Sequence, residues 1–352
     1  MKRLYQQEKW KRQSRRRQAY EEEARRRWLA FQRVRHGSRP KVDIRVTYNG
    51  QVRIAGPSEF CFLANTEEMI RFFNEVGRAF KLRERVHIDL SQVTSLSSDA
   101  LTVLLSKLHD PRFRKKMRCA YTPPVDPALR QVLQHSGFYK FVRGRKPDND
   151  AQDKGSTVWE WEKESGKKVQ PDVALDLTKL AARNLNRPYN EIRSAYRTIV
   201  ELMGNTHEHA SSELTSVETW WVTVYCEPAG SRVAFTFVDN GVGIFESYGV
   251  RRYKKASLAT KVRQLRGNQF VLSDLLQGLV ESGVGDSGRG NGLPYLKKDC
   301  DAGRISNVII ISNDVWANLA DSHFVKLKRP FRGTFIYWEL EVGSYGNKNA
   351  EG

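Results

Sequence analysis

The sequence predicts a chain of mixed α/β and α+β class, in which a basic helical arm precedes two folded units. Over residues 41–146, short apolar runs alternate with amphipathic stretches, which is typical of a sheet covered by helices. Over residues 172–342, two helical stretches precede the strands, which is typical of an α+β sandwich. Between them, residues 147–171 are polar and rich in Pro, Gly, Asp and Lys, as expected of a linker, and residues 343–352 form a tail.

The composition limits the class of protein. The chain has 352 residues and a formal net charge of +19, and this length suffices for two cores of ordinary domain size. No run approaches the roughly 18–20 apolar residues of a membrane-spanning helix, and no apolar signal segment follows Met1. We therefore expect a cytoplasmic protein that does not enter a membrane. The four cysteines include no CxxC pair, which argues against a disulfide framework and a structural zinc site.

Residues 1–40 form the basic arm, which is rich in good helix formers. Residues 1–41 hold 15 Lys and Arg against 4 Asp and Glu, so this segment carries more than half of the net charge. Two interpretations remain open for it. The arm is either a solvated helix that covers part of the body, or a polyanion-binding segment, because clustered Lys and Arg release counterions from phosphate backbones. Nothing in it favours DNA over RNA or acidic protein.

The first unit is predicted to alternate strands with helices. Asn49-Gly50 is a strong hairpin signal, and Thr66 is a candidate N-cap for a helix that carries two acidic residues in its first turn. In chain order, the expected elements are the hairpin, a helix over 65–80, a strand over 85–93, a helix over 97–110, a strand over 116–122, and a helix over 126–142 that ends near Gly137.

The second unit is predicted to begin with helices. In chain order, the expected elements are helices over 176–185 and 189–210, strands over 216–228 and 231–241, a long mobile segment over 245–287, and strands over 304–313 and 333–342. A glycine-rich stretch over 288–292 opens a further helix before the last two strands.

Four segments of this second unit carry residues suited to chemistry. On the helix over 189–210, Glu201, Asn205 and His209 are four residues apart and share one face. Directly after a strand, Asp239 precedes Gly241 and Gly243, which places an acid at the strand end and glycines where a backbone approaches a ligand closely.

The other two segments are rich in glycine. Gly288, Gly290 and Gly292 alternate with polar residues before a helix, where free backbone N–H groups cradle phosphates and the helix N-terminus favours negative charge. Gly333-Thr334 enters the last strand. Each segment alone is weak support for a function, but the four together, in this order, are specific.

Their order, their elements and the ExxxN spacing resemble the GHKL ATPase superfamily over about residues 172–342. This superfamily includes histidine kinases, type II topoisomerase and chaperone ATPase domains, and anti-sigma serine kinases. The stretch from Glu201 to Ala210 is most similar to the anti-sigma pattern ELxxNxxxHA. The resemblance implies a Bergerat-type α/β sandwich that binds ATP and Mg²⁺, with residues 245–287 as the ATP lid.

The resemblance also implies a role for each matching residue. Asn205 would hold the magnesium ion that bridges the phosphates, and Glu201 would polarise an attacking water or hydroxyl. Asp239 would accept from the adenine amino group, Gly243 would pack under the base, and Thr334 would support the adenine through a water. The full set of implied nucleotide-binding residues is Asn205, His209, Asp239, Gly241, Gly243, Gly288, Gly290, Gly292 and Thr334.

The first unit carries a second resemblance. HIDLSQVTSLSSDALTVLL and LRQVLQHSGFYKFV are similar to STAS domains over about residues 42–146. In the anti-sigma antagonists of that family, a serine at the turn before the helix is phosphorylated by a GHKL kinase. Here the turn holds Ser97, Ser98 and Asp99, with Ala100 in place of the family glycine. Three interpretations of this turn remain open. Asp99 could act as a fixed negative charge, Ser98 could accept a phosphate, or a serine could only cap the helix.

Together, the two resemblances favour a regulatory protein. Binding and slow hydrolysis of Mg²⁺-ATP would switch the engagement of a partner protein by the STAS-like unit and the basic arm. One alternative is a serine/threonine kinase of the anti-sigma type that acts on a STAS domain. Another is a nucleic-acid-binding stress or phage-defence protein with a nucleotide switch. GHKL domains often dimerise, which leaves a homodimer open.

Overall fold

The computed structural model describes residues 47–48, 51–82, 84–110, 119–140, 142, 159–161, 169–209, 219–227, 230–245, 267–278 and 292–342. The predicted basic arm over 1–40, most of the predicted linker and lid, Gly288, Gly290 and the predicted tail over 343–352 lie outside these residues. The chain divides into two compact units, Met1–Val46 and Thr47–Gly352. All of the described residues belong to the second unit. None of its described helices is long and apolar enough to cross a lipid bilayer.

The fold is mixed α/β, with parallel and antiparallel pairing. The first sheet has the order β1-β2-β4-β6, formed by Thr47–Tyr48, Gln51–Ala55, Val86–Asp89 and Cys119–Thr122. β1 and β2 pair antiparallel, with Tyr48 opposite Gln51, as the predicted hairpin requires. β2, β4 and β6 are parallel, and so are two short strands, β3 (Glu59–Phe60) and β5 (Ser95–Leu96).

Two α-helices connect these strands, and a third follows the last of them. α2 spans Thr66–Lys81 and buries a stripe of apolar side chains, while α3 spans Ser98–His109 and is buried along most of its length. α5 spans Pro127–His135 and is capped by Asp126, which accepts from the backbone N–H of Ala128 at 2.8 Å; a short 3₁₀ turn, η1 (Phe138–Lys140), follows. The predicted Thr66 cap is wrong: Asn65 occupies the cap position, and the Thr66 hydroxyl donates to the Phe62 carbonyl.

The second sheet is antiparallel, with the order β10-β11-β9-β8-β7. Its strands are β7 (Trp159–Trp161), β8 (Trp220–Cys226), β9 (Arg232–Asp239), β10 (Ser306–Asn318) and β11 (His323–Glu341). Two features differ from the sequence prediction. The linker contributes an edge strand, β7, and β10 and β11 extend into one long hairpin, because bulges near Asn313 let the strands continue beyond the sheet.

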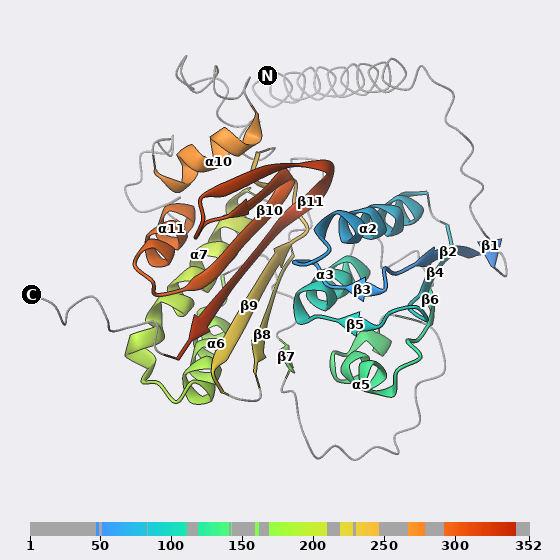
Figure 1. Ribbon diagram of the computed structural model, residues 1–352, viewed down its shortest axis with the longest axis horizontal. Coiled ribbons are helices and arrows are strands. Elements are labelled where there is room, and N and C mark those ends of the chain that lie inside the picture. Colours follow the sequence, from blue (N-terminus) through green and yellow to red (C-terminus); the bar gives the residue numbers. More distant parts are fainter. Residues whose placement is uncertain are drawn as a thin grey trace, which may run out of the picture. The chain divides into compact units, whose positions relative to one another are not determined.

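Helices cover one face of this second sheet. They are α6 (Pro171–Asn184), α7 (Arg193–His209), which follows the 3₁₀ turn η2 (Tyr189–Ile192), and α11 (Gly292–Asp301) (Figure 1). Phe235 of β9 and Trp338 of β11 stack on this face, with ring centroids 5.1 Å apart, and belong to the core that these helices share. α10 (Asn268–Leu276) lies within the predicted lid and packs on α11 and β10.

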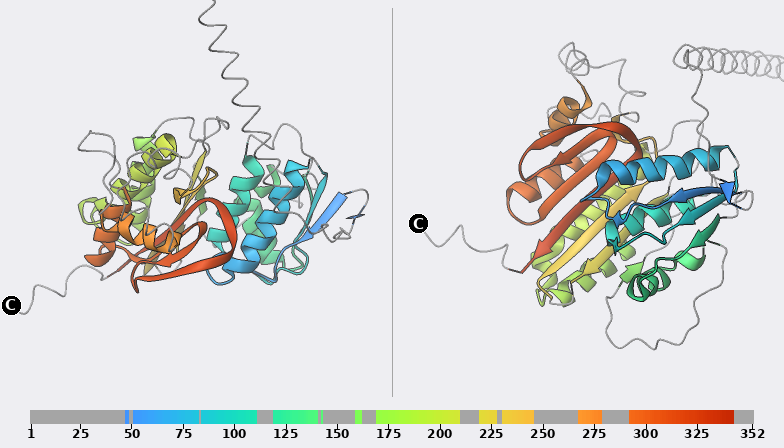
Figure 2. Two further views of the ribbon diagram at one scale, coloured as in Figure 1. Left: turned by 90° about the horizontal axis from the view of Figure 1, so that it is seen from above. Right: turned by 45° about the vertical axis from the view of Figure 1, so that its right-hand side comes forward.

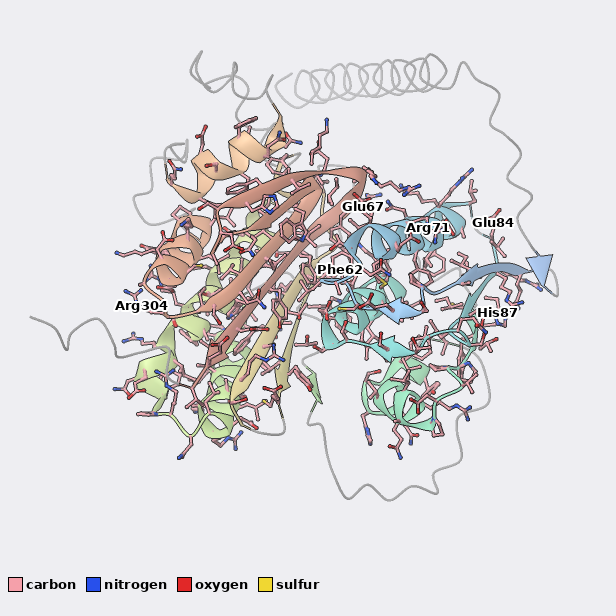
Figure 3. The ribbon with its side chains drawn as sticks, in the orientation of Figure 1. Phe62, Glu67, Arg71, Glu84, His87 and Arg304 are labelled. Atoms are coloured by element: carbon pink, nitrogen blue, oxygen red, sulfur yellow. The ribbon has the colours of Figure 1, made fainter. Side chains whose placement is uncertain are left out.

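The opposite face of the sheet is covered by the N-terminal helices α2 and α3 (Figure 2). Because strand residues alternate between faces, Val238 and Phe335 point into a core that also contains residues of α2 and α3. The Phe62 ring centroid lies 5.3 Å from that of Phe331 and 4.7 Å from that of Phe335, and Figure 3 shows Phe62 at this junction. The sequence predicted two units, but it did not predict this shared core.

Candidate functional site

The first and third predicted segments meet where α11 begins. Gly292 is the first residue of α11, and it lies against Glu201 and Asn205 of α7. A Cβ atom placed on Gly292 would lie 2.6 Å from Nδ2 of Asn205 and 3.3 Å from Cβ of Glu201. Any larger residue here would displace the amide of Asn205. The structure therefore brings Glu201 and Asn205 together with the last of the three alternating glycines.

Asp239 lies at the end of β9 on the face that carries α7 and α11. Its side chain is buried, with 6% of the residue exposed. One carboxylate oxygen accepts from the backbone N–H of Gly241 at 2.7 Å, and the hydroxyl of Thr334, directly opposite in the register, also donates to it. Burial raises the pKa of Asp239 above its ordinary value, while these hydrogen bonds and the charge of Lys107 partly offset the rise.

The fourth segment contacts the second one. Gly333 has a φ of +103°, and a Cβ atom placed on it would lie 2.1 Å from the carbonyl oxygen of Asp239. Only glycine fits both the conformation and the contact. The carbonyl of Gly333 accepts from the hydroxyl of Ser312 at 3.0 Å, so β9, β10 and β11 are joined around Thr334 and Asp239.

The loop that follows Asp239 is tied to β10. The side-chain NH₂ of Asn313 donates to the Val242 carbonyl at 2.9 Å, and the hydroxyl of Ser312 accepts from the Ile244 N–H at 2.9 Å. Gly243 has a φ of +88°, and a Cβ atom there would lie 2.3 Å from Oδ1 of Asn313. Neither Ser312 nor Asn313 was among the residues predicted from the sequence. The feature that could have indicated them is their place as two polar residues directly after an apolar run, in the stretch IIISN.

The side chain of Asn240 points away from Asp239, to the other face of the sheet. Its Nδ2 donates to the Ser106 carbonyl at 2.7 Å, and its Oδ1 accepts from Nζ of Lys107 at 2.7 Å. Both partners belong to the C-terminal half of α3. These contacts join residues 133 and 134 positions apart, and no pattern in the sequence predicts them.

Several predicted residues have a different or undescribed position. Gly288 and Gly290 lie outside the described residues, as does the side chain of His209. Gly241 is buried, and its N–H is engaged by Asp239. Within the described part of the chain, no group of three or more His, Cys, Asp or Glu could hold a metal ion. A cation at Asn205 would therefore need further oxygen ligands from a bound molecule or from water.

The turn at the start of α3 is closed by Asp99. Ser97 is the cap residue of α3, but its side chain does not cap the helix; its hydroxyl donates to the Phe60 carbonyl at 3.3 Å. Asp99 is 3% exposed, and its Oδ2 accepts from the N–H groups of Phe62 at 2.8 Å and Leu63 at 3.1 Å. The carboxylate at this turn therefore faces the chain's own loop rather than a partner.

Comparison with protein-family models and with curated proteins finds no match to this chain. The function is therefore inferred from the residues themselves and from the contacts between them.

Proposed function

We propose that this chain is a regulatory protein that binds Mg²⁺-ATP through residues 172–342, in the way the GHKL resemblance implies. The observation that supports it best is the convergence of the segments. Gly292 lies against Asn205, and Gly333 lies against Asp239, although these segments are far apart in the sequence. Both contacts join residues of the four segments on which the resemblance rests, and this agreement supports the proposal.

Asp239 supplies what recognition of adenine requires. A buried carboxylate accepts hydrogen bonds but does not donate them, so it favours the amino group of adenine over the carbonyl of guanine. The bonds from Gly241 and Thr334 hold this carboxylate in one orientation. The turn at Gly243 admits no side chain, because a Cβ atom there would lie 2.3 Å from Oδ1 of Asn313. A role in binding adenine also explains why the protein keeps a buried carboxylate whose charged form is unfavourable.

The region around Asn205 suits the phosphates and the cation. An amide oxygen is a ligand that Mg²⁺ accepts, because this ion keeps several waters and takes its remaining ligands from substrate phosphates. The N-terminus of α11 begins at Gly292 and favours negative charge. Bound Mg²⁺ would neutralise phosphate charge. Glu201 lies one turn before Asn205 on α7 and would accept a proton from a water molecule, as the resemblance implies.

Magnesium-dependent uptake of ATP tests the proposal, and Gly292→Ala is the variant to use with it. The added Cβ would displace the amide of Asn205, so we expect the affinity for ATP with Mg²⁺ to fall about tenfold or more, with little change in ATP binding in EDTA. Isothermal titration calorimetry measures both.

The matched control for this variant is Gly204→Ala on α7, where a Cβ would meet only Val169 at 4.0 Å. Its affinity for ATP should equal that of the wild-type protein. Wild-type protein that takes up no ATP in the presence of Mg²⁺ would contradict the proposed function.

The fate of the γ-phosphate distinguishes an ATPase switch from a protein kinase. The turn before α3 favours the switch, because Asp99 is buried and the Ser97 hydroxyl is bonded to a backbone carbonyl. With labelled ATP we expect free phosphate and no labelled protein. Glu201→Gln should lower phosphate release roughly 100-fold while ATP still binds, as for loss of a general base. Labelled protein that disappears in the Ser97→Ala/Ser98→Ala double variant would instead establish the kinase.

A further inference from the structure

One ammonium group joins the two segments that carry the proposed adenine site. Nζ of Lys107 donates to Oδ1 of Asn240 at 2.7 Å and to the carbonyl of Arg332 at 2.9 Å. Asn240 directly follows Asp239, and Arg332 directly precedes Gly333. The same ammonium lies 4.8 Å from the ring centroid of Phe331. Lys107 therefore holds the ends of both segments from the face of the sheet opposite the site.

The side chain of Asn240 is buried and bonds to α3 through both its oxygen and its nitrogen. Asn240 is 1% exposed, and its amide also donates to the Ser106 carbonyl at 2.7 Å. The end of α3 is thus bonded through both groups of one amide. Because a buried amide that loses its partners is costly, Asn240 cannot keep its position if α3 moves away.

Asp239 and Asn240 are neighbours that face opposite sides of the sheet. Asp239 faces α7 and α11, and Asn240 faces α3. A displacement of the backbone on one side is therefore transmitted to the other within a single peptide unit. The charge of Lys107 also reaches the carboxylate, since it lowers the pKa of Asp239 against the rise caused by burial.

We propose that Lys107 is a positioning residue of the nucleotide site, and that it makes nucleotide binding and the docking of α3 on the sheet depend on each other. This inference rests on the proposed ATP binding and adds its regulatory output. ATP that orders Asp239 and Thr334 stabilises the docked α3 through Lys107. By thermodynamic reciprocity, a partner protein that draws α3 away lowers the affinity for ATP.

The test combines calorimetry with amide hydrogen exchange on the full-length chain. In the wild-type protein, saturating Mg²⁺-ATP should slow the exchange of α3 amides at least about threefold more than that of α5 amides, because α5 lacks a contact of this kind with the site among the described residues. In Lys107→Met, which keeps the aliphatic stem, ATP affinity should fall about tenfold. At saturating ATP, its α3 should no longer gain this extra protection.

Lys179→Met is the matched control, because Lys179 is an exposed lysine on α6. It should bind ATP as the wild-type protein does and show the same protection of α3. A general loss of stability in Lys107→Met would change exchange with and without ATP alike, whereas loss of linkage removes the effect of ATP alone.

Three results would overturn the inference. Wild-type protein that binds ATP without extra protection of α3 excludes the linkage while leaving the nucleotide site intact, and this result does not depend on any variant. Lys107→Met that matches the wild type in affinity and in α3 protection excludes the role of Lys107. Wild-type protein that takes up no ATP removes both this inference and the proposed function.

Discussion

Asp239→Asn is expected to reduce ATP affinity about 100-fold and to raise the thermal stability of the protein at neutral pH. The affinity falls because the amide replaces a charged acceptor that the adenine amino group needs, and hydrogen bonds to charged groups contribute about 1.5–3 kcal/mol. The stability rises because the substitution removes a buried charge, while the amide oxygen can still accept from Gly241. Calorimetry measures the first effect and thermal unfolding the second.

The pH dependence of this gain has a defined sign. Burial raises the pKa of Asp239 above 3.8, so the folded protein holds this proton to a higher pH than the unfolded chain does. The contribution of Asp239 to stability is therefore greatest below pH 3.8 and is lost as the pH rises through the raised pKa. Since the amide does not titrate, the difference in Tm between Asp239→Asn and the wild type should widen as the pH rises through this window.

Asp176→Asn provides the comparison for this variant, because Asp176 is an exposed acid on α6. We expect it to leave the ATP affinity unchanged. If Asp239→Asn binds ATP as tightly as the wild type, Asp239 does not recognise the base. If its Tm falls, the carboxylate is instead needed for the fold.

Gly333→Ala is expected to cause the largest loss of stability. The backbone at Gly333 has a φ of +103°, which L residues rarely adopt, and the added Cβ would lie 2.1 Å from the carbonyl oxygen of Asp239. Backbone cannot rotate away as a side chain can, so strain and clash together should cost about 3 kcal/mol or more. Thermal unfolding should show a Tm lowered by several degrees, and ATP binding should weaken because Asp239 shifts.

Gly77→Ala gives the opposite result and serves as its control. Gly77 lies inside α2, where an added Cβ would meet nothing within 4 Å. Alanine is the better helix former by about 0.5–1 kcal/mol, so this variant should be slightly more stable than the wild type. A Gly333→Ala protein as stable as the wild type would show that the β9–β11 contact tolerates a side chain.

Local patterns in the sequence predicted many of the elements. The helices over 65–80 and 97–110, and the strand at 231–241, follow from apolar spacing and turn residues, and the structure confirms them with small changes at their ends. The strand predicted at 333–342 is present but begins ten residues earlier, at His323. The patterns failed where the signal was not local. β7 arises from three residues in a polar stretch, and the outer half of the β10–β11 hairpin depends on bulges around Asn313 rather than on a run of apolar residues.

The candidate site divides in the same way. The sequence marked Glu201, Asn205, Asp239 and Thr334, because residue type and spacing limit what such groups can do. It could not mark Ser312, Asn313, Lys107 or Asn240, whose contacts described above join residues 21 to 225 positions apart. Such pairs leave no periodic trace, since each residue looks like an ordinary surface polar group until the chain folds.

The sequence by itself determined the basic charge, the order of the elements and the chemical groups available to bind a nucleotide, because all three depend on residue type and on spacing of a few positions. Only the tertiary structure decided that α2 and α3 cover the second face of the antiparallel sheet, and that Lys107 reaches the peptide beside Asp239. The physical reason is that both features require distant segments to bury apolar surface against each other and to pair their polar groups. These contacts form only when the whole sheet is assembled.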